Sequence, residues 1–159
     1  MAGTLTERQE PADVAVTTDG EHWYGVAGNL YRYDSLDDLY SGSPAATLEG
    51  DQSWMATIAA HQGRLYTTGL WPASELVEVI NPDTLTVERT IPLDDSAGLY
   101  YWGFSITEAG MHLISTGPEG DPPRLVRYDL ETGEIIGEMW LPRSIAPVMT
   151  GLVCETELE

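Results

Sequence analysis

The chain has 159 residues, of which 26 are acidic and 7 basic, and its net charge of −19 excludes nucleic acids and anionic membrane surfaces as partners, because like charges repel. The single cysteine excludes an intrachain disulfide and a cysteine-based zinc site. The sequence contains no run of about 18 apolar residues of the kind that spans a membrane. Its length is sufficient for one domain with a hydrophobic core.

The acidic excess is combined with a complete lack of lysine, since all seven basic residues are arginine. At high salt, surface carboxylates hold water and ions, and their repulsion is screened because the Debye length falls to about 3 Å at 1 M. The composition resembles that of halophilic proteins and predicts a cytoplasmic location in an organism with molar internal salt. The alternative is an acidic protein from a GC-rich genome, in which arginine codons displace lysine codons.

Residues 1–12 contain no apolar segment of the kind that a secretory signal requires, so we expect them to form an N-terminal extension. A repeat follows, in which a tight turn recurs at three dipeptides: Asp19-Gly20, Gln62-Gly63 and Ala109-Gly110. Each unit continues into a second hairpin, and the hairpins are anchored on three residues spaced by 47 and 48 positions: Asp34, Asn81 and Asp129. The repeat predicts three units of strand, turn, strand, loop, strand, turn and strand.

The third unit shows the pattern in full. Its four expected strands are YYWGFSIT, MHLISTG, RLVRYDL and EIIGEMWL, and Gly133 is free to adopt positive φ in the last turn. No window of ten residues has helical periodicity. Four-stranded units of about 40–50 residues are typical of β-propeller blades.

The segments LVRYDLETG and LVEVINPDT resemble the third strand and turn of YVTN and quinoprotein-like β-propeller repeats, which often read V-x-V-I-D-x-x-T-G. The resemblance covers about residues 13–141 and implies an all-β fold of three four-stranded antiparallel blades. The expected blades are 13–50, 51–93 and 94–142, followed at 143–159 by an extra strand and an acidic tail.

Three blades make about half of a six-bladed ring, so both end faces need a partner. We expect closure by a homodimer or by a partner propeller half, unless the chain is a fragment of a longer propeller. The apolar residues expected on the end faces are Val14, Val16, Tyr24, Val26, Ile106, Leu113 and Ile135.

Propeller ligands bind at the mouth of the central channel, which is lined by the loops that enter each first strand and join the second and third strands. Aromatic residues beside polar loops can form an apolar ligand wall. The predicted ligand-binding residues are Trp54, Trp71, Ser74, Tyr101, Trp102 and Phe104. Alternatively, Trp54 and Trp102 fill the wedge between blades.

Two further segments, TTGLWPAS and YYWGFSIT, resemble patterns of the five-bladed bacterial and plant-type glutaminyl cyclases, S-T-G-L-Y-G-x-S and Y-F-G-E-G-x-T. The matching residues are Thr68, Gly69, Leu70, Ser74, Tyr101, Trp102, Gly103 and Thr107. The family's proton-shuttling acid falls on Phe104, whose ring cannot transfer a proton. The resemblance therefore implies a site that is inactive in cyclisation.

Catalytic and metal sites have little support in the sequence. The repeat places His22 and His112 at the position of Arg64, and His61 in a turn, so we expect exposed polar positions rather than metal ligands. No G-x-S-x-G elbow, calcium loop or phosphate-binding loop occurs. We expect no catalytic residue, no metal and no cofactor, and interpret the chain as a non-catalytic module that binds a partner protein or small ligand. A propeller enzyme related to glutaminyl cyclases or lactonases, with a degenerate or composite site, is the alternative.

Overall fold

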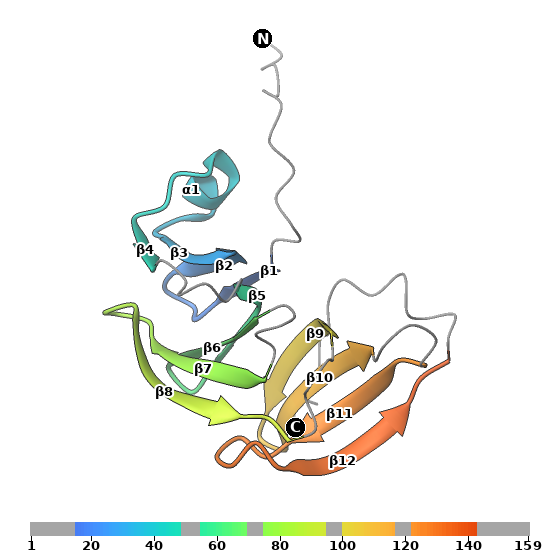
Figure 1. Cartoon of the computed structure of the whole chain (residues 1–159). Helices are drawn as coiled ribbons and strands as arrows, with labels where there is room; N and C mark the ends of the chain where they lie inside the picture. Colours follow the sequence, from blue (N-terminus) through green and yellow to red (C-terminus); the bar gives the residue numbers. More distant parts are fainter. Residues whose placement is uncertain (1–14, 49–54, 70–74, 95–99, 117–121, 143–159) are drawn as a thin grey trace, which may run out of the picture.

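The structure is a computed structural model that describes residues 15–48, 55–69, 75–94, 100–116 and 122–142. These residues form three separate four-stranded antiparallel sheets (Figure 1). In each sheet the spatial order of the strands is their order in the sequence. The predicted all-β fold of propeller blades is confirmed. The single helix of the described ranges is too short to cross a membrane.

The first sheet contains β1 (Ala15–Thr18), β2 (Trp23–Ala27), β3 (Asn29–Tyr33) and β4 (Ala46–Leu48). A six-residue helix, α1 (Leu36–Ser41), joins β3 to β4 where the sequence predicts a tight turn. Ser35 caps the helix by accepting the backbone N–H of Asp38 at 3.1 Å, and Gly42 ends it with a φ of 67°. The expected turn therefore contains a short helix, which a search of ten-residue windows does not reveal because the helix has only six residues.

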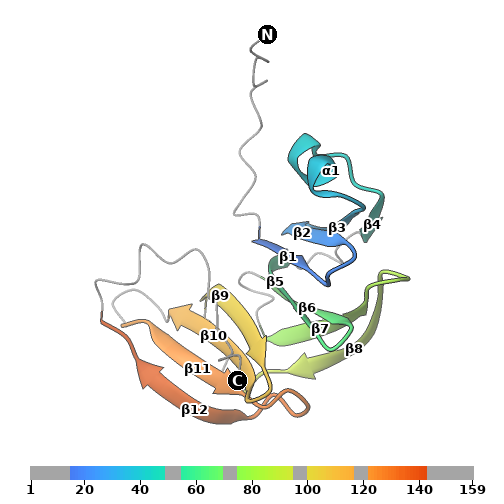
Figure 2. The same ribbon diagram turned by 180° about the vertical axis from the view of Figure 1, so that it is seen from behind.

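The second sheet contains β5 (Met55–His61), β6 (Arg64–Gly69), β7 (Leu76–Asn81) and β8 (Thr86–Pro92). The third contains β9 (Tyr100–Thr107), β10 (Gly110–Thr116), β11 (Arg124–Tyr128) and β12 (Ile135–Trp140). The first strands of the sheets lie side by side, β1 against β5 and β5 against β9. From them the sheets fan outward to β4, β8 and β12, which is the arrangement of successive propeller blades (Figures 1 and 2).

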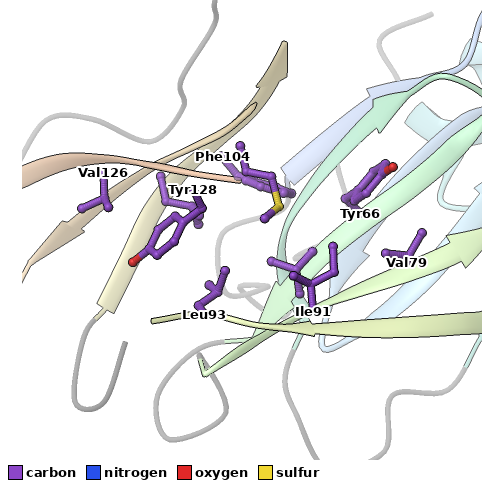
Figure 3. Packing of buried hydrophobic residues seen from close by; sticks show 10 residues of the cluster. Tyr66, Val79, Ile91, Leu93, Phe104, Val126 and Tyr128 are labelled. Atoms are coloured by element: carbon purple, nitrogen blue, oxygen red, sulfur yellow. The ribbon is translucent and has the colours of Figure 1, made fainter. Parts of the chain in front are cut away.

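Two hydrophobic cores fill the spaces between the sheets. We call the face that a sheet turns toward the next sheet in the chain its leading face, and the opposite face its trailing face. The core between the second and third sheets joins leading-face residues such as Tyr66 and Val79 to trailing-face residues such as Phe104 and Tyr128 (Figure 3). The other core joins the leading face of the first sheet, including Tyr24 and Val26, to the second sheet.

The apolar residues expected on the end faces are mostly inside these cores. Tyr24, Val26 and Leu113 are fully buried, and Ile106 and Ile135 pack against the core between the second and third sheets. Of the expected set, Val16 is exposed, and Val14 lies outside the described residues. The assignment was wrong because strand alternation separates two faces without showing which face meets a neighbouring sheet.

The turns between third and fourth strands repeat one hydrogen-bonding pattern. Asn81 accepts the backbone N–H of the residues two and three positions later at 2.9 and 3.2 Å, and Asp129 does the same at 2.9 and 2.8 Å. The fifth residue of each turn has positive φ, 50° at Leu85 and 74° at Gly133. The side chain of Leu85 packs between the first two sheets, whereas Gly133 lies against the backbone of Pro92.

Candidate functional site

The predicted channel mouth is the end of the sheets at which second strands lead to third strands. Trp54, Trp71 and Ser74 lie outside the described residues. Tyr101 and Trp102 belong to β9, and the structure describes their backbone but not their side chains. The assignment of these five residues to a ligand site therefore stays a prediction.

Phe104 has a well-defined place in the core. Its side chain is 7% exposed and lies on the trailing face of the third sheet, in the cluster that contains Tyr66 and Met111 (Figure 3). A buried phenyl ring packs against apolar neighbours and neither donates nor accepts a proton. At this point of the cyclase-like pattern the chain thus has a packing residue, and a role for Phe104 in ligand binding stays a prediction.

Buried hydroxyl groups lie at the mouth end of the second sheet. Thr57 and Thr68 are opposite one another on β5 and β6, and their Oγ1 atoms are 3.2 Å apart. Strand alternation places both on the leading face, the side that Ala59 and Tyr66 share. The two hydroxyls form a hydrogen-bonded pair directed at the third sheet.

A third buried hydroxyl lies on the trailing face of the third sheet, which is packed against the second sheet. Ser115 is fully buried on β10, on the trailing face that it shares with Met111 and Leu113. Its Oγ has no hydrogen-bond partner among the described residues. A buried hydroxyl without a partner costs about 1–3 kcal/mol, so a group that supplied a hydrogen bond here would be bound favourably.

A cation lies next to this hydroxyl. Arg124 is opposite Ser115 on β11, and its Nη1 is 3.1 Å from a carboxylate oxygen of Glu138. The guanidinium carbon is 6.0 Å from the centroid of the Trp140 ring, which is largely exposed. Arginine over an indole is a favourable cation–π arrangement, so Arg124 orients an accessible aromatic surface at the mouth end of β12.

The chemistry available at this end of the sheets is hydrogen bonding and apolar contact. The hydroxyls of Thr57 and Thr68 are hydrogen-bonded to one another, and the Oγ of Ser115 has no described hydrogen-bond partner. The described ranges also contain no group of three His, Cys, Asp or Glu side chains that could hold a metal ion. The described groups at this end are hydroxyls, one cation and an exposed indole.

The histidines are not equivalent, contrary to the sequence interpretation. The strand register places His112 opposite Arg127, as Tyr24 is opposite Arg32, so His112 takes the position of a core tyrosine. His112 is half-buried, and burial, followed by the charge of Arg127, lowers its pKa. The expectation that His112 is an exposed polar residue was wrong, because one position along a strand moves a side chain to the other face.

Sequence reasoning did not single out Thr57, Ser115 or Arg124 as site residues, and used Thr68 only as a motif match. A signal is present in the sequence, since hydroxyl residues precede a glycine at the end of the second strand in two units, as TTG at 67–69 and STG at 115–117. Their burial between two sheets follows only from the packing of those sheets.

No protein-family model matches this sequence, and no curated protein matches it. Solved β-propeller structures are similar in fold. The glutaminyl cyclase of Myxococcus xanthus matches with a TM-score of 0.58 and 13% identity over 84% of this chain and 56% of the cyclase. The WD40 β-propeller domain of Doa1 matches with a TM-score of 0.56 and 14% identity over 90% of this chain and 44% of that one.

A computationally designed protein, Ika4, is also similar, with a TM-score of 0.53 and 13% identity over 90% of this chain and 82% of the designed one. Identities this low show the fold alone. This chain spans about half of the glutaminyl cyclase and less than half of the Doa1 domain.

Proposed function

We propose that this protein is a non-catalytic β-propeller binding or scaffold module, which takes a small ligand or a segment of a partner protein at the channel mouth. The observation that carries the proposal is the set of buried hydroxyls between the second and third sheets, in which Ser115 has no described hydrogen-bond partner. A catalytic role has less support, because Phe104 occupies the position of the proton-transferring acid in the cyclase-like pattern.

The proposal includes closure of the ring by a second copy of the chain. Each end sheet has a face that no described sheet covers, and exposed apolar residues lie on the leading face of the third sheet. Burying apolar area contributes about 25 cal/mol per Å². Twofold pairing would cover both end faces and create a six-bladed ring of twice the 17.4 kDa mass of one chain.

Binding at the mouth is tested by thermal-shift measurements against a panel of small organic ligands and short peptides, including peptides with N-terminal glutamine. We expect at least one compound to raise the melting temperature of the wild type and to lose this effect in Thr68→Val and Ser115→Ala. Thr86→Val is the matched control, because Thr86 is exposed at the opposite end of the second sheet.

A shift that persists in both mouth variants would place the ligand elsewhere. Release of a pyroglutamyl product from the glutamine peptides, lost in the mouth variants, would favour the alternative of a propeller enzyme with a composite site. Light scattering of the wild type tests the ring, since a folded 17.4 kDa monomer at micromolar concentration contradicts closure by a second copy.

A further inference from the structure

Arg127 in the third sheet has the position of Arg32 in the first. Each arginine is two residues before the hairpin anchor of its unit, and each lies opposite the equivalent residue of the second strand, His112 and Tyr24 respectively. Residues opposite one another on neighbouring strands share a face. Tyr24 is buried against the second sheet, so Arg32, on the same face, lies on the leading face of the first sheet. Arg127 has the equivalent register position and therefore lies on the leading face of the third sheet.

Arg32 shows what this position does when a following sheet is present. Its Nη1 donates to the carbonyl oxygens of Pro82 and Asp83 at 3.4 and 3.1 Å. Both carbonyls belong to the turn between β7 and β8. The arginine thereby ties the first sheet to the third-to-fourth-strand connection of the second.

At the next junction, between the second and third sheets, other residues bind the equivalent connection, the turn between β11 and β12. Arg89 of β8 is 3.1 Å from a carboxylate oxygen of Glu131, which has the turn position of Asp83. The backbone N–H of Asp94 donates to the carbonyl oxygen of Gly133 at 3.1 Å. At both junctions, a sheet binds the third-to-fourth-strand connection of the sheet that follows it.

The leading face of the third sheet carries the elements of such a junction. Arg127 is exposed, and no described carboxylate lies within ion-pair distance of its guanidinium group. Two exposed apolar side chains, Ile136 and the 55% exposed Met139, lie on the same sheet. Met139 is opposite Leu125 on the leading face. A Cβ atom added at Gly110 would lie 3.3 Å from the side chain of Ile136 and 3.5 Å from that of Arg127, which places Ile136 on the same face.

The corresponding connection in the first sheet is complementary in charge and polarity. It contains α1, which lies on the side of β2 and β3 that faces away from the second sheet (Figures 1 and 2). None of its residues is buried; Asp37 is exposed in its first turn, and Leu36 and the 72% exposed Tyr40 add apolar surface. A six-residue helix has little stability of its own and gains it from tertiary packing.

We propose that the leading face of the third sheet docks onto α1 and the trailing face of the first sheet in a second copy of this chain, with Arg127 in contact with the carboxylate of Asp37. Ser35 has the position in its unit that Pro82 has in the second unit, but its carbonyl oxygen already accepts the N–H of Leu39 at 3.2 Å. The helix therefore offers an arginine its carboxylates in place of a free turn carbonyl. This inference rests on the proposed closure of the ring and specifies the surface by which it occurs.

Charge reversal tests the contact in the full chain, at about 0.15 M salt, where a Debye length of about 8 Å leaves contacting charges little screened. Sedimentation velocity is measured for Arg127→Glu, Asp37→Arg, their equimolar mixture and the double variant. Arg64→Glu is the matched control, because Arg64 is an exposed arginine of the second sheet. Circular dichroism establishes that each variant is folded.

We expect each single variant to weaken dimerisation at least about 100-fold, because like charges then meet at both junctions of the ring. The mixture and the double variant restore opposite charges at both junctions and should return to within about 10-fold of the wild type. Arg64→Glu should dimerise like the wild type. A dimer that is insensitive to Arg127→Glu, or is not restored in the mixture, overturns the docking surface while leaving ring closure intact. A folded wild-type monomer overturns both and assigns the face to another occupant, such as a further blade of a longer chain.

Discussion

Replacing Gly133 with alanine separates two contributions that this glycine makes, positive φ and close approach of two sheets. Its φ is 74°, where an L-residue pays about 1–2 kcal/mol relative to its right-handed conformation. A Cβ atom added at this position would overlap the carbonyl oxygen of Pro92 and lie 2.9 Å from its carbonyl carbon. The end of β8 would have to move away from the turn.

Such a movement breaks the hydrogen bond from the Asp94 N–H to the Gly133 carbonyl, which contributes about 0.5–1.5 kcal/mol. With the cost of positive φ, Gly133→Ala should lose about 2.5 kcal/mol of unfolding free energy. In a chain of this size that corresponds to a fall in Tm of about 5–10 °C.

Gly63→Ala is the matched control, because Gly63 has a φ of 71° and no atom within 4 Å of an added Cβ. It should lose about 1–2 kcal/mol, the cost of positive φ alone. Urea unfolding of the three proteins at one salt concentration, followed by far-UV circular dichroism, gives both differences. If the two variants agree within about 0.5 kcal/mol, the close contact between the turn and Pro92 does not constrain this junction.

Further changes test the turns, the core, the surface charge and the chemistry. The backbone N–H of Thr132 is the main cause that lowers the pKa of Asp129 below its usual value, so its stabilisation is present above the unfolded pKa and is lost as pH falls. Melting curves from pH 7 to pH 3 should show this loss in the wild type, whereas Asp129→Asn, which copies Asn81, should lack that contribution; identical pH profiles contradict it. Val26→Asp buries an unpaired charge between two sheets and should unfold the chain, at a cost above about 4 kcal/mol, as seen by circular dichroism; a folded variant contradicts the core assignment. The wild-type melting temperature should be higher in about 2 M KCl than in dilute buffer, since salt screens the −19 charge; a flat or falling series rejects the halophilic interpretation. With Phe104 at the position of the acid, peptides with N-terminal glutamine should show no cyclisation by mass spectrometry, and turnover would reject the proposal of an inactive site.

The strands and most turns follow from the sequence because their causes are local. Alternating side chains predict the four strands of the third unit, and Gly20, Gly63 and Gly110 adopt the positive φ expected of tight turns. Repetition of one pattern at intervals of 47 and 48 residues was sufficient to predict three blades. The local exception is α1, since six residues with a capping serine carry too little periodicity to distinguish a helix from a turn.

The tertiary structure decides which face of each strand is covered, and hence which residues belong to a core, a ligand site or an interface. Val26 and Val16 belong to neighbouring strands and are both apolar, yet one is buried and the other exposed, because one face of their sheet meets the second sheet. Ser115 becomes a candidate site residue, and Phe104 a core residue, for the same reason. Strand periodicity separates two faces of a sheet, but the energy of burial depends on the sheet packed against each face, and that sheet comes from a distant part of the chain.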